Sequence, residues 1–484
     1  MKRDPIDSFV DTFVSALHNQ NAAIFAGAGL SIPAGLVNWK QLLKSIASEI
    51  GLDVDKEEDL ITVAQFHVNE HGGRHRINQA LIDEFAQRAK LTENHKLLAG
   101  LPIKTYWTTN YDPLIEDSLK AAGKTPDVKI TPENLATTTP HRDAVVYKMH
   151  GDVSQADKAI LTKDDYETYE SKRHLFSMAL QGDLVSKTFL FIGFSFNDPN
   201  LSYILSRIRI LLGENRREHY CLLRRVQRND FKKASDYQYA LAKQQLQVKD
   251  LKRYGIQGLL VDDYAHYTNV LRRVSYRYKM ARAFISGSAA DYSPWKEPKA
   301  LQFIQGLSRA LIEGGFGIVS GYGLGVGPYV LNGVFEQLDA EGTQSLDDRI
   351  VLRPFPIAIP DAARRKIRWT AYREDMLSYA GLALFLFGNK RGASGTVVAA
   401  DGMEEEFKLA VAKGLFVVPV GCTGSTAAVL HKKVLGDFST YYPVSGYRSH
   451  FEALGRQGTP SQVTKRIIKL LMKLRDDKAL PGAK

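Results

Sequence analysis

Apolar runs of strand length recur along the chain between helical stretches, and this alternation most constrains the fold. In the first half the runs are AAIFAG at 22–27, TYWTT at 105–109, AVVYKMHG at 144–151, TFLFIGF at 188–194 and HYCLL at 219–223. Strands that are buried on both faces of a parallel sheet read as continuous apolar runs, and the helices between them cover those faces. The first half is therefore predicted to be a mainly parallel sheet flanked by helices.

The same alternation restarts near residues 276–282. The later runs are AFISGSA at 283–289, FGIVSGYGLGVG at 316–327, LALFLFGNK at 382–390 and LFVVPVG at 415–421. A chain of 484 residues is long enough for two hydrophobic cores. We predict an α/β protein of two domains, 1–280 and 281–484, each with a mainly parallel Rossmann-like sheet flanked by helices. The boundary is expected near residue 281, inside or just after a basic helix that begins at Tyr264.

Cysteine content and hydropathy exclude several protein classes. The two cysteines, Cys221 and Cys422, form neither a disulfide framework nor a four-cysteine zinc site, and no metal is expected. The N-terminal residues lack the apolar core of a signal peptide, and no run approaches the roughly 18 apolar residues that cross a bilayer. We expect a soluble cytoplasmic protein with no membrane partner.

The net charge of +11 favours anionic partners, and nucleic acid is one candidate. The basic residues cluster in RREHYCLLRRVQRNDFKK, LRRVSYRYKMARAF and KRIIKLLMKLR. Each cluster is interleaved with apolar residues at helical or strand spacing, which is typical of a solvated face above a buried one. The charge alone therefore does not predict nucleic-acid binding.

Polar groups follow several of the predicted strands in the first half. The first strand runs into FAGAGLSIPAG, ahead of a helix expected near Trp39. Glycines at such a point let the backbone approach a pyrophosphate, although they also serve ordinary turn geometry. The other polar strand ends are Asn110 with Asp112, His150, and Ser195 with Asn197 and Asp198. Because the carboxyl ends of parallel strands share one edge of the sheet, these groups predict a nucleotide site.

The motifs GAGLS, TTNYD, KMHGD and GFSFNDPN occur in this order within residues 9–280, and together they resemble the sirtuin family. The resemblance implies that Asn110 holds the nicotinamide ribose of NAD+ and positions a nucleophile, and that His150 is the general base. It also implies a set of NAD-binding residues: Ala26, Gly27, Ala28, Ser31, Asp112, Gly193, Ser195 and Asn197.

This chain departs from deacetylating sirtuins at three points. It lacks their four zinc cysteines, it has IPAGLVNWK where they have Ser-Gly-Ile-Pro-Asp-Phe-Arg, and Thr109 replaces the glutamine before the catalytic asparagine. Peptide deacetylation is therefore not expected. The remaining chemistry is hydrolysis of the bond between nicotinamide and ribose, with NAD+ as substrate.

The second half contains two glycine-rich stretches. In IVSGYGLGVGPYVLNGVF, the alternate glycines form either a phosphate cradle or a flexible bend. GASGTVVAADGMEEEFKLA places Gly-Thr ahead of an acidic helix and resembles the nucleotide-binding SLOG-type superfamily, which includes the lysine-decarboxylase-like phosphoribohydrolases. Their Pro-Gly-Gly is missing here and the glutamate is displaced, so ligand sensing is expected rather than hydrolysis.

A sirtuin-like domain followed by such a sensor resembles the Thoeris antiphage NADase effectors. The shared motifs include GSA, SGYGLGVG, RPFP, YREDM, FGNK and the Glu-Phe of EEEF. The resemblance implies that a TIR-domain partner makes a cyclic ADP-ribose isomer, which binds the second domain and activates destruction of NAD+ by a homotetramer. The implied activator-binding residues are Arg373 and Lys390 at the pyrophosphate, Gly287 and Ser288 beside it, and Gly402 and Glu406 at ribose or base.

One alternative belongs to another functional class. The chain could bind NAD without cleaving it, as a nucleic-acid-associated or scaffolding protein. The charge of +11 supports this alternative. The presence of both Asn110 and His150 and the absence of a recognisable nucleic-acid-reading motif oppose it.

Overall fold

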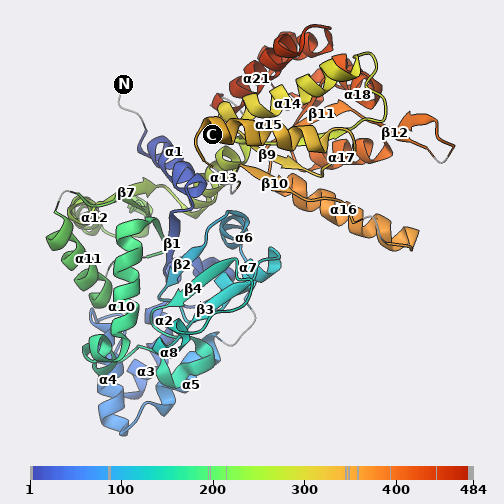
Figure 1. Cartoon of the computed structure of the whole chain (residues 1–484). Helices are drawn as coiled ribbons and strands as arrows, with labels where there is room; N and C mark the ends of the chain where they lie inside the picture. The colour runs from blue at the N-terminus through green and yellow to red at the C-terminus, as the bar shows by residue number, and fades with distance from the viewer. Residues whose placement is uncertain are drawn as a thin grey trace. The chain divides into compact units, whose positions relative to one another are not determined.

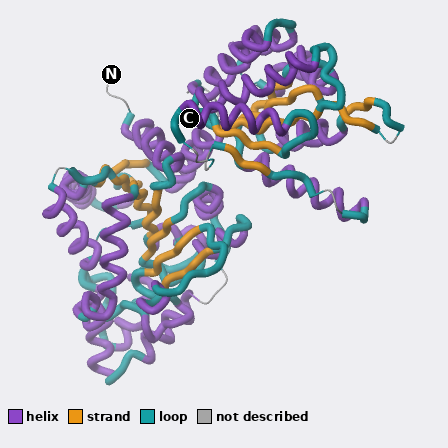
Figure 2. The backbone as a smooth tube through the Cα atoms, viewed as in Figure 1, coloured by secondary structure: helices purple, strands orange, loops and turns teal. Residues whose placement is uncertain are grey.

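The computed structural model describes residues 4–85, 89–194, 196, 198–213, 215–343, 346, 349–356, 359–392, 394–442 and 444–477. The chain forms two compact units, Met1–Ser275 and Tyr276–Lys484 (Figure 1). In each unit, helices surround a sheet of parallel strands (Figure 2). The predicted α/β class with two Rossmann-like sheets is confirmed. Among the described residues, no helix is both long enough and apolar enough to span a bilayer.

The first unit is built on a seven-stranded sheet in the order β3-β4-β2-β1-β5-β6-β7, in which every neighbouring pair is parallel. Its strands are β1 (Ala22–Ala26), β2 (Thr105–Thr108), β3 (Pro126–Lys129), β4 (Ala144–Lys148), β5 (Thr188–Ile192), β6 (His219–Arg224) and β7 (Ile256–Val261). The strands β1, β2 and β5 are buried along their whole length, which accounts for their continuous apolar sequences.

Within the described part of the first unit, thirteen α-helices accompany this sheet, and the last of them, α13, extends past Ser275. They are α1 (Pro5–His18), α2 (Trp39–Leu42), α3 (Lys44–Glu49), α4 (Leu60–His71), α5 (His75–Phe85), α6 (Glu93–Gly100), α7 (Leu114–Ala121), α8 (Pro132–Leu135), α9 (Lys163–Glu167), α10 (Tyr169–Ser186), α11 (Pro199–Leu212), α12 (Ala234–Leu251) and α13 (Tyr264–Met280). The helix expected near Trp39 begins at that residue, where the Asn38 side chain accepts from the backbone N–H of Gln41.

Helices α2 to α5 have a small apolar core of their own. Leu43, Ile46, Val63 and Leu81 are buried in it, and it packs against Tyr111, directly after β2. This helical segment therefore lies at the carboxyl edge of the sheet, where ligands of parallel sheets bind.

The second unit contains a five-stranded parallel sheet in the order β10-β9-β8-β11-β14. Its strands are β8 (Arg282–Ser288), β9 (Gly317–Ser320), β10 (Ile350–Leu352), β11 (Leu382–Phe387) and β14 (Phe416–Pro419), and a hairpin is formed by β12 (Asn389–Arg391) and β13 (Val397–Ala399). The helices are α14 (Glu297–Glu313), α15 (Gly327–Ala340), α16 (Ala362–Ser378), α17 (Asp401–Ala412), α18 (Ser425–Gly436), α19 (Phe438–Tyr441), α20 (Arg448–Glu452) and α21 (Pro460–Asp476).

The basic runs belong to these regular elements. KRIIKLLMKLR lies in α21, where Ile467, Leu470, Leu471 and Leu474 are buried in the core. The run HYCLL belongs to β6, whose first four residues are buried. The charged residues of α21 therefore lie beside a buried apolar stripe, whereas those of the first basic run lie before and after the buried part of β6.

Candidate active site

A cavity of about 410 Å³ lies at the carboxyl edge of the first sheet. Strands β4, β2, β1 and β5 are neighbours in the sheet, and the turns after all four strands contribute to the cavity. Strands β2, β4 and β3 lie on one side of β1, and β5, β6 and β7 lie on the other side. The turns after β1 and β5 therefore meet at the topological switch point of the sheet. The contributing residues include Gly27, Asn110, Asp112, His150, Gly193 and Asp198.

The glycines after β1 are required by the contact between two turns. The Gly29 N–H donates to the Gly193 carbonyl at 2.9 Å. A Cβ on Gly27 would lie 2.5 Å from the Gly193 oxygen, and one on Gly193 would lie 2.3 Å from the Leu30 nitrogen. Gly193 also has a φ of +66°, which favours glycine. These glycines therefore let the two turns touch while their backbone lines the cavity.

The remaining residues of the predicted NAD-binding set differ in position. Ala28 and Ser31 line the cavity. Ala26 is fully buried inside the end of β1, its carbonyl accepts from Thr108 Oγ1 at 3.0 Å, and it is not among the lining residues. Ser195 and Asn197 lie outside the described residues.

Asn110 is held rigidly between the turns after β2 and β1. It is 7% exposed, and its Nδ2 donates to the Gly27 carbonyl at 3.1 Å and to Ser31 Oγ at 3.0 Å. Both amide hydrogens are thus used, and no hydrogen bond between described residues involves Oδ1. The side chain can therefore offer its Oδ1 to a hydroxyl group or a water in the cavity.

Asp112 supplies a second acceptor at the same edge. One carboxylate oxygen accepts from the Leu114 N–H at 3.1 Å, which fixes the side chain at the start of α7. The other oxygen, Oδ2, is buried and has no hydrogen-bond partner among the described residues. Since a buried acceptor without a partner is costly, this oxygen suits a ligand that brings a donor, such as a ribose hydroxyl.

His150 forms a close pair with Asp198. Its Nε2 lies 2.8 Å from Asp198 Oδ2, an ion-pair distance without the alignment of a hydrogen bond, and its Nδ1 has no partner among the described residues. Tyr166 donates its hydroxyl to the same carboxylate oxygen at 3.4 Å. Burial raises the pKa of Asp198, but the neighbouring His150 and the backbone N–H groups of Leu201 and Asn200 outweigh burial and hold this pKa below its ordinary value. An imidazole beside an ionised carboxylate is suited to accept a proton.

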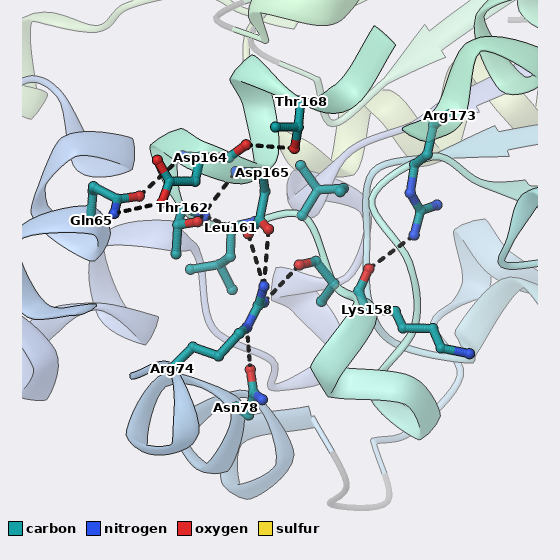
Figure 3. A network of polar contacts seen from close by, with 12 residues as sticks. Gln65, Arg74, Asn78, Lys158, Leu161, Thr162, Asp164, Asp165, Thr168 and Arg173 are labelled. Atoms are coloured by element: carbon teal, nitrogen blue, oxygen red, sulfur yellow. Dashed lines mark hydrogen bonds and ion pairs between the residues drawn. The ribbon is translucent and has the colours of Figure 1, made fainter. Parts of the chain in front are cut away.

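The backbone before His150 is fixed by a buried arginine. Arg173, at a kink in α10, donates from Nη1 to the carbonyls of Ile130 at 2.8 Å and Met149 at 3.4 Å, and from Nη2 to the Lys158 carbonyl at 2.9 Å. Figure 3 shows the contact to Lys158 and the neighbouring network around Arg74. The turn that carries His150 is therefore held from outside the cavity.

Arg74 holds the segment that follows that turn. Its Nη1 pairs with Asp165 at 3.0 Å, and its Nη2 donates to the Ala159 carbonyl at 2.8 Å (Figure 3). The next residue, Ile160, donates its N–H to the His150 carbonyl at 2.8 Å. The position of His150 is thus restricted by the hydrogen bonds of Arg173 to the preceding carbonyl and by the Ile160 segment, which Arg74 holds in place.

An apolar wall completes the cavity. Val37, Trp39, Ile61 and Phe85, from the segment containing α2 to α5, line it together with Phe194. Ligand pockets typically combine such a wall with a few fixed polar groups, which suits an aromatic ring attached to a sugar.

The predicted activator-binding residues of the second unit gather near the start of α17. Arg373, buried on α16, donates to Glu405 at 2.7 Å, and its Nε lies 3.5 Å from Glu406. A Cβ on Gly402 would lie 2.8 Å from Arg373 Nη2, so this glycine makes room for the guanidinium. Lys390 is half-exposed and pairs with Asp401, the residue before Gly402.

Gly287 and Ser288 lie at the carboxyl end of β8, opposite Leu386 and Phe387 of β11. A Cβ on Gly323 of the glycine-rich loop would lie 2.0 Å from the Gly287 carbonyl. The loop therefore packs directly on the end of β8, which explains part of its glycine content. All six predicted residues are accordingly near the carboxyl edge of this sheet or the start of α17.

Comparisons with known proteins agree with this two-part organisation. The family described as SIR2-like domain matches residues 104–249, and the Sir2- and TIR-associating SLOG family matches residues 266–474. The NAD(+) hydrolase ThsA of Bacillus cereus (strain MSX-D12) is 49% identical over 445 residues, which cover 92% of this chain and 92% of that protein. The NAD(+) hydrolase ThsA of Acinetobacter baumannii (strain 532279) is 46% identical, covering 96% of this chain and 97% of that protein. This chain belongs to the ThsA family of NAD(+) hydrolases.

Membership of the ThsA family confirms the resemblance inferred from the motifs. A more distant relative, the Defense-associated sirtuin 2 of Bacillus subtilis, is 28% identical over 202 residues, which cover 40% of this chain and 20% of that protein.

Two features of the sites were missed in the sequence. Asp198 was recognised as a polar strand end but was given no role, although it is the partner of His150. In the second unit Glu406 was singled out, while its neighbour Glu405 makes the shorter contact with Arg373. Met403, Glu406, Phe407 and Ala410 are the buried residues of α17, and their helical spacing could have identified Glu406 as buried. No local pattern indicates the pairing of Glu405.

Proposed function

We propose that the cavity of the first unit cleaves the bond between nicotinamide and ribose in NAD+ by hydrolysis. The observation that carries the proposal is the convergence of Asn110, Asp112 and the His150–Asp198 pair on one cavity with an apolar wall. The family to which the chain belongs consists of NAD(+) hydrolases, which supports the same substrate.

Nicotinamide is a good leaving group, because breaking its bond to ribose neutralises the positive charge on its ring nitrogen. The ribose carbon then becomes oxocarbenium-like and is attacked by water, which gives nicotinamide and ADP-ribose. His150 accepts the proton of that water and later releases it to solvent, while Asp198 stabilises the imidazolium. Asn110 and Asp112 hold the ribose hydroxyls or the water, and the carboxylate favours the developing positive charge.

Release of nicotinamide from NAD+ by the full-length chain tests this assignment. His150→Ala should lower the rate by about 10²–10⁴-fold, because it removes the general base. NAD+ binding and the thermal midpoint of unfolding should change little. Wild-type turnover in a folded His150→Ala protein would show that the chemistry takes place elsewhere.

The proposal extends to control by the second unit. A cyclic ADP-ribose isomer, made by a TIR-domain partner, binds near Arg373 and Lys390 and activates the first unit. In the structure Arg373 is paired with Glu405 and stacks over Phe355 at 5.1 Å, so it is already oriented towards an anionic group. A pyrophosphate is a bidentate partner for this guanidinium and can replace a half-buried carboxylate. The family description, which names association with TIR, supports a partner of this class.

Depletion of NAD+ then serves antiphage defence, and the defence-associated sirtuin among the relatives supports this setting. The proposed active form is a homotetramer. Large apolar side chains are exposed on two adjacent helices of the first unit, which supports assembly through that surface. They are Leu175, Met178 and Val185 on α10, and Tyr203, Ile210 and Leu211 on α11.

A further inference from the structure

A buried lysine lies directly beneath the two turns that carry the proposed catalytic residues. Lys148 is the last residue of β4 and is 0% exposed. Its Nζ donates to the Asp112 carbonyl at 2.6 Å and to the Tyr111 carbonyl at 3.2 Å. Two of its three ammonium hydrogens can thus bind the backbone of the turn that follows β2.

The same ammonium also contacts two carboxylates. It lies 3.2 Å from Glu116 Oε1, on the first turn of α7, and it pairs with Asp152. Asp152 follows the His150–Gly151 turn and accepts from the Ser154 N–H at 2.8 Å. Lys148 and Asp152 therefore flank His150 in the sequence and are joined to each other in space.

The register of the sheet explains why one side chain reaches both turns. Thr108, the last residue of β2, is paired with Lys148 in the parallel ladder. The turn with Asn110 and Asp112 begins after Thr108, and the turn with His150 begins after Lys148. Beyond this pair two backbone bonds connect the segments that follow the strands: the Met149 N–H donates to the Thr108 carbonyl at 2.9 Å, and the Val153 N–H donates to the Tyr111 carbonyl at 3.1 Å. The Lys148 ammonium adds a charged connection between the same two turns, because it binds the Asp112 carbonyl and pairs with Asp152.

We propose that Lys148 is a positioning residue for NAD+ cleavage, which fixes the Asn110–Asp112 turn relative to His150. The inference rests on the proposed function of the cavity. Lys148 is not among the residues that line the cavity, so it acts through the two turns and not on the substrate. A displacement of about 1 Å between reacting groups can lower the rate by about 100-fold. A side chain that fixes the distance between the two turns therefore has a direct effect on kcat.

The charge of the cluster favours a protonated lysine. Burial lowers the pKa of Lys148, but Glu116, Asp152 and Asp112 together raise it above its ordinary value. Burial raises the pKa of Glu116. Burial also acts to raise the pKa of Asp152, but Lys148 outweighs burial there and the pKa of Asp152 is lowered. Removal of the ammonium leaves buried carboxylates without their counterion, which destabilises the fold strongly. A test must therefore separate loss of position from loss of stability.

Lys129 offers a matched control. It is the last residue of the edge strand β3, is 2% exposed, lies 2.9 Å from Asp127 Oδ1 and donates to the Thr137 carbonyl. It is thus also a buried lysine with a carboxylate and a carbonyl partner, but neither partner belongs to a proposed catalytic turn.

The experiment compares Lys148→Met, Lys148→Met combined with Glu116→Gln, and Lys129→Met in the full-length chain. Turnover of NAD+ is measured with the isomer of cyclic ADP-ribose that gives the highest wild-type rate, and thermal unfolding is followed in parallel. Both Lys148 variants should lose about 10- to 100-fold in kcat with KM changed by less than about threefold. The Glu116→Gln change should restore part of the thermal stability without restoring kcat. Lys129→Met should lower the unfolding midpoint and keep kcat within about twofold.

A Lys148→Met protein, alone or with Glu116→Gln, that is folded and keeps wild-type kcat overturns the inference. Equal losses of kcat in the Lys148 and Lys129 variants also overturn it, because they indicate general destabilisation. His150→Ala is measured in the same series to separate the two proposals. If His150→Ala is inactive and Lys148→Met is fully active, only the positioning role fails. If His150→Ala is fully active, or if the wild type does not cleave NAD+, the proposed function fails first.

Discussion

Replacing Asp198 by asparagine should impair catalysis without unfolding the protein. Besides accepting from the Tyr166 hydroxyl, Asp198 has two separate tasks. Its Oδ2 lies 2.8 Å from His150 Nε2, and its Oδ1 accepts from the Leu201 N–H at 2.8 Å as the N-cap of α11. Asparagine is as good an N-cap as aspartate, so Asp198→Asn keeps the second task and removes the negative charge needed for the first.

The magnitude follows from the distance between the two groups. At 2.8 Å and an effective dielectric constant of about 20, the attraction between imidazolium and carboxylate is about 6 kcal/mol before desolvation. Desolvation of two buried groups offsets much of this attraction. We take the net contribution of this charged contact as about 1.5–3 kcal/mol, the range for hydrogen bonds to charged groups. Since about 1.4 kcal/mol corresponds to a factor of ten, kcat should fall by about 10- to 100-fold.

The assay is nicotinamide release at saturating NAD+ in the presence of the activating isomer. Asp361→Asn is the matched control, because Asp361 is also an N-cap, accepting from the Arg364 N–H at 2.6 Å, but lies on α16 of the other unit. Both variants should unfold within a few degrees of the wild type, and only Asp198→Asn should lose turnover. Unchanged kcat in Asp198→Asn would refute the reasoning that this carboxylate supports His150 as a base.

Three further predictions concern the turns, the pH dependence and the assembly. Gly193→Ala should destabilise the first unit by about 2 kcal/mol more than Gly72→Ala in denaturant unfolding. Both glycines have a φ of +66°, but the added Cβ of Gly193 would lie 2.3 Å from the Leu30 nitrogen, whereas that of Gly72 would meet open space. Equal losses of stability in the two variants would contradict this reasoning. Burial lowers the pKa of His219 from 6.5 to about 3, so the unfolded chain binds a proton between these pH values and the folded chain does not. The free energy of unfolding should therefore fall by roughly 2 kcal/mol between pH 6.5 and 5, and a His219→Gln variant with the same pH slope would exclude this cause. Ile210→Glu, at a side chain that is 77% exposed on α11, should reduce the molar mass measured by light scattering, and an unchanged mass would exclude that surface from the assembly.

The sequence predicted those strands whose burial on both faces requires apolar residues. Strands β1, β2, β4, β5 and β6 were identified because their apolar runs end at glycine, polar or charged residues. The edge strand β3 was missed because it reads Pro-Asp-Val-Lys, and its charged side chains are buried through ion pairs with each other and with Arg142 and through hydrogen bonds to Thr137 and Thr139. Such pairing is set by tertiary contacts and leaves no apolar run.

The same distinction applies to the site. Asn110, Asp112 and His150 were predicted to converge because parallel strands end at one edge, and all three line the cavity. The supporting contacts were not predicted. Arg173 binds three carbonyls through a kink in α10, and Lys148 reads as an ordinary strand residue. Contacts between side chains and distant backbone carbonyls carry no periodic signal in the sequence.

The central claim is that the first unit cleaves NAD+ and the second unit controls the cleavage. Its most direct test is the rate of nicotinamide release by the full-length chain with NAD+ and each of several cyclic ADP-ribose isomers. The wild type is compared with His150→Ala and Arg373→Ala, and binding of each isomer is measured by calorimetry. We predict that one isomer activates the wild type, that His150→Ala binds this isomer without releasing nicotinamide, and that Arg373→Ala neither binds it tightly nor is activated. Full activation of Arg373→Ala, or undiminished release by His150→Ala, would contradict the claim.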